Sequence, residues 1–209
     1  EGQDRPAYFL HLAEVAWMLQ DARMNNEVVA AGYLHDMIED CGYTQQQLTE
    51  ETGHPRVAEL VDWVSEPEKD RSWEERNGVY LQRMREAPME VLALSCADKA
   101  SNLRDMLRLI DRGYELDSFL SVGKEKQIAK FEGLDELYSG VVSEKIYKRY
   151  STALSKLKDP KAYKPQYVIG ELQEKSVEEF QQAVDEQIGR EMLEAYEKGY
   201  GPVLMPSND

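Results

Sequence analysis

The chain of 209 residues is poor in cysteine and in basic residues, and it has no long apolar run. Its two cysteines, Cys41 and Cys96, exclude a disulfide framework, so we expect a reducing, cytoplasmic environment. The net charge of −15 argues against a nucleic acid polymer as partner, because polyanions are bound by basic surfaces. No apolar run approaches the roughly 20 residues of a membrane helix, so we expect no membrane partner.

Strand signals are scarce too, whereas apolar residues recur at helical spacing along most of the chain. Capping boxes at Thr44 and Ser72 predict two helix starts, and Pro55 suits the first position of another. The predicted helices span roughly residues 6–19, 24–42, 44–53, 55–64, 72–87, 91–110, 121–139, 141–157 and 176–198. We therefore expect an all-α fold, with a helical domain at residues 1–157. Residues 158–209 should form a linker, an amphipathic helix and a tail.

One segment places an imidazole and three carboxylates within six residues of an apolar helical run: His35-Asp36-Met37-Ile38-Glu39-Asp40. Unpaired buried charge is costly, so these groups need partners. On one continuous helix, His35 would stack on Glu39 and Asp36 on Asp40, because each pair is four residues apart. We expect the first layer to bind a metal ion and the second to handle a water molecule.

A mononuclear metal site needs more ligands, and two residues elsewhere are suitable. His11 lies on the apolar stripe of the first predicted helix, and Asp98 interrupts the most hydrophobic run, four residues before Asn102. Two histidines and two aspartates suit a divalent first-row metal; the carboxylates favour Mn²⁺, with Fe²⁺, Co²⁺, Ni²⁺ and Zn²⁺ as alternatives. Taken singly, each residue fits a structural role, as a core histidine, a helix cap or an interhelical tie. Their combination favours a metal site.

The order and spacing of these residues resemble the HD-domain phosphohydrolase superfamily. The six-residue segment resembles the HDxxED box of RelA/SpoT-type (p)ppGpp hydrolase domains, and residues 97–105 resemble that group's A-D-(K/R)-x-x-N-(L/M)-R segment. Residues 8–11 resemble its P-Y-(I/F)-x-H-P entry, and residues 2–5 its G-Q-x-R turn. The resemblance covers about residues 2–157 and implies an HD-domain helical bundle with a C-terminal helical extension. The family's preceding first helix has no counterpart here, and the chain begins with Glu1, so we expect a missing N-terminal segment.

The resemblance also implies a role for each matching residue. The metal ligands would be His11, His35, Asp36 and Asp98, with Mn²⁺ as the ion. Glu39 and Asp40 would orient and deprotonate the attacking water, and the substrate would be a small anionic nucleotide. Its contacts would be Asn102, Arg5, Lys99 and Arg104. The implied reaction is release of 3′-pyrophosphate from ppGpp.

Two alternatives differ from this interpretation. The first is an HD phosphohydrolase for another nucleotide or phosphorylated metabolite, such as NADPH or a nucleoside monophosphate. The adjacent Glu39 and Asp40 favour the alarmone substrate over it. The second is a non-catalytic HD module that binds a nucleotide or a protein, which the complete set of expected ligands disfavours. The C-terminal extension could cover the active site, complete the core or form a homo-oligomer interface.

Overall fold

The computed structural model describes residues 8–66, 70–115, 117, 120 and 122–159, and these form nine helices and no strand. The helices are α1 (Tyr8–Asp21), α2 (Asn26–Leu34), α3 (Met37–Cys41), α4 (Gln45–Thr52), α5 (Pro55–Val64), α6 (Trp73–Glu86), α7 (Met89–Asp111), α8 (Lys124–Tyr138) and α9 (Glu144–Lys158). The all-α prediction is therefore confirmed. The described residues belong to one compact unit, Glu1–Lys164. The predicted helix at 176–198 lies outside them, so the proposed domain boundary stays a prediction.

Local sequence signals explain several helix ends. Thr44 and Ser72 each form a capping box, in which the side chain accepts from the amide three residues on and that residue's side chain accepts from the cap. Pro55 occupies the first turn of α5, where its missing N–H costs nothing. Gly53 ends α4 with φ +69°, a conformation that disfavours side chains. These boundaries agree with the sequence-based expectation.

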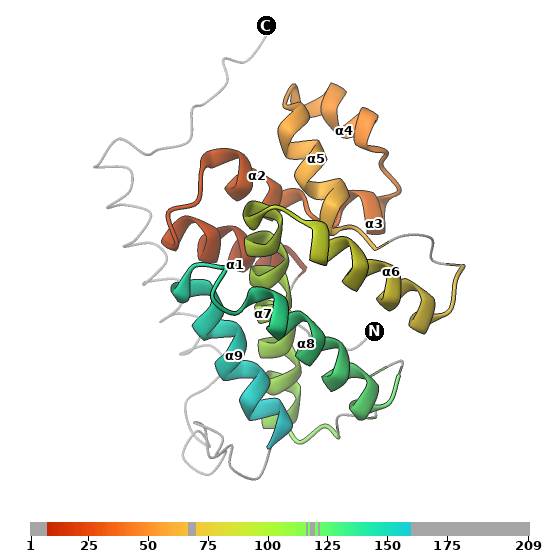
Figure 1. Cartoon of the computed structure of the whole chain (residues 1–209), viewed down its shortest axis with the longest axis vertical. Coiled ribbons are helices and arrows are strands. Elements are labelled where there is room, and N and C mark those ends of the chain that lie inside the picture. The colour runs from red at the N-terminus through yellow and green to blue at the C-terminus, as the bar shows by residue number, and fades with distance from the viewer. Residues whose placement is uncertain (1–7, 67–69, 116, 118–119, 121, 160–209) are drawn as a thin grey trace, which may run out of the picture. The chain divides into compact units, whose positions relative to one another are not determined.

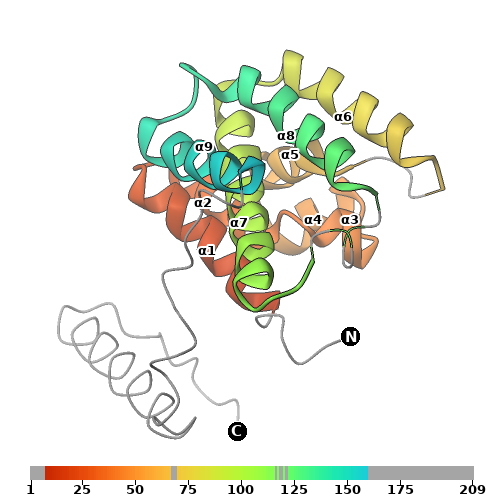
Figure 2. The same ribbon diagram turned by 90° about the horizontal axis from the view of Figure 1, so that it is seen from below.

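Helix α7 runs through the middle of the described domain, with α1 and α2 on one side and α6 and α8 on the other (Figures 1 and 2). It contacts α1, α2, α5, α8 and α9. Every residue from Val91 to Asp98 is buried, which explains why this stretch is apolar all round rather than on one face. Asp98, the charged residue of this stretch, therefore faces other protein elements rather than bulk solvent.

Gly32 sets the approach of α2 to α1. A Cβ atom at this position would lie 2.8 Å from Leu19 Cδ1 and 3.0 Å from the backbone Cα of Ala16. Since only glycine fits without a shift of one helix, the two helices pack closely at this point. This contact brings the end of α2, and with it His35, towards α1.

The predicted single helix over residues 24–42 is wrong, because the segment forms two helices. Helix α2 ends at Leu34, His35 and Asp36 form a turn, and α3 begins at Met37. Asp36 has φ −93° and ψ 0°, and its side chain makes no cap hydrogen bond to α3. The break leaves the Asp36 carboxylate available for other contacts.

None of the helices within the described ranges is long and apolar enough to cross a membrane.

Candidate metal centre and active site

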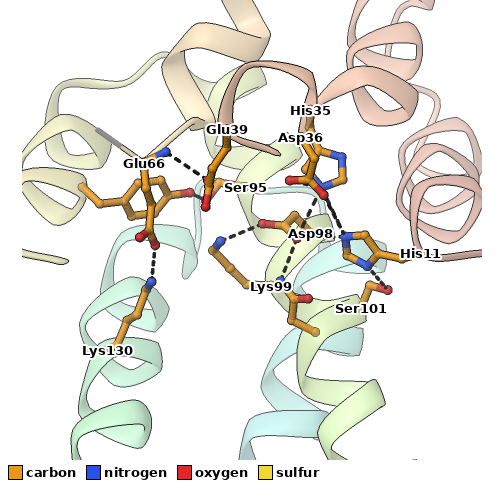
Figure 3. A network of polar contacts seen from close by, with 12 residues as sticks. His11, His35, Asp36, Glu39, Glu66, Ser95, Asp98, Lys99, Ser101 and Lys130 are labelled. Atoms are coloured by element: carbon orange, nitrogen blue, oxygen red, sulfur yellow. Dashed lines mark hydrogen bonds and ion pairs between the residues drawn. The ribbon is translucent and has the colours of Figure 1, made fainter. Parts of the chain in front are cut away.

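Four residues from three parts of the chain converge at one point (Figure 3). His11 comes from α1, His35 and Asp36 from the turn after α2, and Asp98 from α7. His11 Nε2 lies 3.2 Å from His35 Nε2 and 3.3 Å from Asp98 Oδ1. His35 Nε2 lies 3.5 Å from Asp98 Oδ1 and 3.3 Å from Asp36 Oδ1.

These separations suit donor atoms that share one small ion at about 2.0–2.2 Å. Ligand atoms of His11, His35 and Asp98 all lie within 4.8 Å of one another, and the described residues hold no other such group of histidine, cysteine and acidic side chains. Asp36 Oδ2 lies 3.9 Å from His11 Nε2, so its carboxylate borders the same point. The donor set fits a divalent cation.

Hydrogen bonds to Nδ1 fix both imidazole rings with Nε2 directed at the centre. The Ser101 hydroxyl donates to Glu14 Oε2 at 2.8 Å, so its oxygen accepts from His11 Nδ1–H at 3.0 Å. His35 Nδ1–H donates to the backbone carbonyl of Gly32 at 2.9 Å, since a carbonyl can only accept. With Nδ1 as the protonated nitrogen, the neutral form of each ring directs its Nε2 lone pair at the centre. Such outer hydrogen bonds are the usual support of metal-binding histidines.

The electrostatics of the centre favour a cation. Burial of the His35 ring opposes its positive charge, but the hydrogen bond and charge of Asp98, with the charge of Asp36, outweigh burial and raise the pKa of His35 to about 9. For Asp98, burial alone would raise the pKa of the carboxyl, yet Lys99 and the two histidines hold that pKa well below 3.8. Asp98 therefore stays ionised beside the two rings.

Glu39 and Asp40 border the same cavity from α3. Glu39 Oε2 accepts a hydrogen bond from the backbone N–H of Glu66 at 3.2 Å. Burial is the largest influence on the Glu39 carboxyl and raises its pKa above 4.5. A carboxylate with a raised pKa is a better proton acceptor near neutral pH. Asp40 is exposed at the cavity edge.

The predicted substrate contacts fall into different settings. Asn102 Nδ2 donates to Asp98 Oδ1 at 2.8 Å, and Lys99 Nζ lies 2.8 Å from Asp98 Oδ2, so both support this carboxylate while lining the cavity. Arg104 pairs with Glu14 and also lines the cavity. Arg5 lies outside the described residues. Their roles towards a substrate stay predictions.

A cavity of about 1170 Å³ opens from the metal centre along α1 and α7. The centre and the acids of α3 occupy one end. Two arginines on α7 and a third just after its end, at four-residue spacing, border the rest together with apolar side chains; these are Arg104, Arg108, Arg112, Leu10, Trp17, Leu109 and Leu120. A cation site beside basic and apolar walls suits a ligand that carries both phosphates and a ring.

Several residues that support the centre were not predicted from the sequence. Glu14 lies three residues after His11, and Ser101 three after Asp98, so helical spacing could have found both. Glu66 and Lys130 gave no local signal, because their link to the site arises from contacts between distant segments.

Comparisons with known proteins agree with this site. The family model described as "HD domain" matches residues 1–114. The guanosine-3′,5′-bis(diphosphate) 3′-pyrophosphohydrolase of Haemophilus influenzae is 34% identical over 115 residues, which cover 51% of this chain and 17% of that protein. The Mycoplasma pneumoniae protein described as a probable enzyme of this name is 34% identical over 140 residues, covering 64% and 18%. The chain thus spans less than a fifth of the length of these curated relatives.

Two solved structures share the fold. The lmo0812 protein from Listeria monocytogenes EGD-e has a TM-score of 0.61 at 29% identity, covering 74% of this chain and 95% of that one. A structure described as a metazoan ortholog of SpoT also has a TM-score of 0.61, at 19% identity, with 74% and 86% covered. The resemblance to RelA/SpoT-type proteins predicted from the motifs is confirmed. This chain belongs to the HD-domain family.

Proposed function

We propose that this protein is a metal-dependent phosphohydrolase that releases 3′-pyrophosphate from guanosine-3′,5′-bis(diphosphate). One observation carries the proposal: two histidine Nε2 atoms and two aspartates converge at one end of a cavity that Glu39 and Asp40 also line. The names of the curated relatives support the choice of substrate. The free cysteines, Cys41 and Cys96, support a cytoplasmic location.

We propose that His11, His35, Asp36 and Asp98 hold the metal ion and that the ion is Mn²⁺. A divalent cation supplies a Lewis acid, which lowers the pKa of water and polarises a phosphoryl oxygen. The fixed rings of His11 and His35 require no reorientation for binding.

The side chains around the centre would handle the proton and the phosphates. Glu39 and Asp40 accept the proton of the attacking water, whose oxygen bonds to the phosphorus attached to the ribose 3′-oxygen. The bond between that phosphorus and the 3′-oxygen breaks, and the 3′-oxygen takes up a proton, so the products are GDP and pyrophosphate. Lys99 and Arg104 offset phosphate charge along the cavity.

A substrate panel tests the proposal. The purified chain is incubated with Mn²⁺ and ppGpp, NADPH or deoxynucleoside monophosphates, and products are separated by anion-exchange chromatography. We expect GDP and pyrophosphate from ppGpp. The Glu39→Gln variant should bind Mn²⁺ like the wild type, and its kcat should fall by a factor of roughly 10²–10⁴. If another nucleotide is cleaved and ppGpp is not, the protein is a different HD phosphohydrolase. If it binds Mn²⁺ but turns over none of these nucleotides, it is a binding module.

A further inference from the structure

On the side away from the candidate metal centre, Glu39 is held by Glu66, whose own side chain belongs to a buried ion pair. Glu66, just after α5, donates its backbone N–H to Glu39 Oε2 at 3.2 Å. Its own carboxylate contacts two cations. Oε1 lies 2.5 Å from Lys130 Nζ on α8 (Figure 3). Oε2 lies 3.2 Å from Arg76 Nη1 on α6. The residue that holds Glu39 is therefore itself held by two other helices.

Burial of the Glu66–Lys130 pair calls for an explanation beyond stability. The side chains of Glu66 and Lys130 are only 11% and 8% exposed. Removing two charges from water costs free energy that their attraction often fails to recover, so an apolar pair would serve packing as well. A second lysine on α8, Lys126, pairs with Glu74 of α6, but these side chains are 59% and 57% exposed. The exposed pair joins α8 to α6, whereas the buried pair joins α8 to the segment just after α5, whose backbone N–H contacts Glu39.

The same network touches the metal centre through Tyr80. Lys130 Nζ lies 5.6 Å from the centroid of the Tyr80 ring, and Lys99 Nζ lies 5.2 Å from it. Tyr80 is fully buried, and its hydroxyl is 2.6 Å from the Ser95 hydroxyl. Lys99 also pairs with Asp98. The rigid Tyr80 ring therefore links Lys99, which supports Asp98, with Lys130, which supports Glu66.

We propose that Glu66 and Lys130 are positioning residues that hold the Glu39 carboxylate in its working orientation. Helix α3 has only five residues, and Met37 and Ile38 are only partly buried against the core, so a further contact is needed to fix the Glu39 side chain. The Lys130 contact fixes the Glu66 side chain and its backbone, and the Glu66 amide fixes one oxygen of Glu39. The other oxygen is left for the cavity. This inference rests on the proposed role of Glu39 in hydrolysis.

The first experiment compares Lys130→Met with Lys126→Met in the full chain. For Lys130→Met we expect kcat to fall by roughly 10–10² on whichever nucleotide the panel shows to be cleaved, because small misplacements of a catalytic group have effects of this size. KM and the Mn²⁺ dissociation constant, the latter measured by calorimetry, should stay within about twofold of wild type. Lys126→Met should match the wild type throughout. An unchanged kcat in Lys130→Met, or an equal loss in Lys126→Met, would overturn the proposal.

The second experiment asks whether Lys130 acts through Glu39. In a Glu39→Gln background, Lys130→Met should reduce kcat no further, because the group that it positions is already lost. A general structural defect would lower kcat in both backgrounds and would contradict the proposal. Glu66→Gln provides a second variant with the same expectation if Lys130→Met folds poorly.

A third measurement does not depend on activity. The Glu66 amide should exchange its hydrogen slowly in the wild type and in Lys126→Met, and faster in Lys130→Met and in Glu39→Ala. Equal exchange in all four proteins would refute the positioning role. If the wild type cleaves no nucleotide, the proposed function fails, while amide exchange still decides whether Lys130 holds the Glu66–Glu39 contact.

Discussion

Ser101→Ala should weaken metal binding although Ser101 itself binds no metal. The hydroxyl is fully buried and lies between His11 Nδ1, at 3.0 Å, and Glu14 Oε2, at 2.8 Å. Without it, the His11 ring loses the partner that fixes its tautomer and orientation. Loss of an outer hydrogen bond of this kind typically lowers metal affinity 10–100-fold. The expected loss of Mn²⁺ binding free energy is thus about 1.4–2.7 kcal/mol.

Ser95→Ala is the matched control on the same helix. Ser95 is also fully buried and makes two hydroxyl contacts of 2.6 Å, to Tyr80 and Tyr138 rather than to a histidine. Its removal leaves two buried tyrosine hydroxyls short of a partner, so the free energy of unfolding should fall by about 1–3 kcal/mol. Its Mn²⁺ affinity should stay within about twofold of wild type.

Isothermal titration of each metal-depleted protein with Mn²⁺ measures the affinities, and urea unfolding measures stability. The reasoning fails if Ser101→Ala binds Mn²⁺ as the wild type does. It also fails if Ser95→Ala weakens binding as much as Ser101→Ala, because affinity would then follow general destabilisation rather than the state of the His11 ring.

Two further predictions concern stability. Gly32→Ala should lower the free energy of unfolding by about 1–3 kcal/mol in urea denaturation, because its Cβ would lie 3.0 Å from the Ala16 backbone; Gly78→Ala, with nothing within 4 Å, should be neutral or slightly stabilising. Burial would raise the pKa of Glu66, but Lys130, Lys99 and Arg76 outweigh it and hold that pKa below 4.5. The stability advantage of wild type over Glu66→Gln should therefore be full above pH 4.5 and shrink as the pH falls further; urea unfolding curves in which it grows on acidification would contradict this.

Most of the fold was predictable because its signals are local. The capping boxes at Thr44 and Ser72 and the proline at position 55 each act within one turn, so the sequence alone locates those helix starts. The break at His35 and Asp36 was not predictable from periodicity, because apolar positions continue through it. Asp36 leaves regular helical geometry where its carboxylate meets two histidines, and that contact exists only in the folded domain.

The candidate site likewise contains residues that the sequence predicts and residues that it does not. His11, His35, Asp36 and Asp98 were predicted from chemistry and order, and the fold brings all four together. Glu66 and Lys130 are 64 residues apart in sequence, and each alone has the pattern of a solvated charge. Their burial follows from contacts of the segment after α5 with α8 and α6, which no short motif records.

The placement of the proposed ligands His11 and Asp98 on α1 and α7 has a consequence for the chain as a polymer. An ion held jointly by His11 and Asp98 closes a loop of 87 residues (98 − 11), whereas in the unfolded chain only the adjacent His35 and Asp36 are near neighbours. In the folded domain His11 and Asp98 already lie close together, so the conformational entropy lost on closing this loop has been lost during folding rather than on metal binding. An ion at the proposed site would therefore bind the native state preferentially and act as a reversible cross-link. Its contribution to stability should rise with the logarithm of metal concentration.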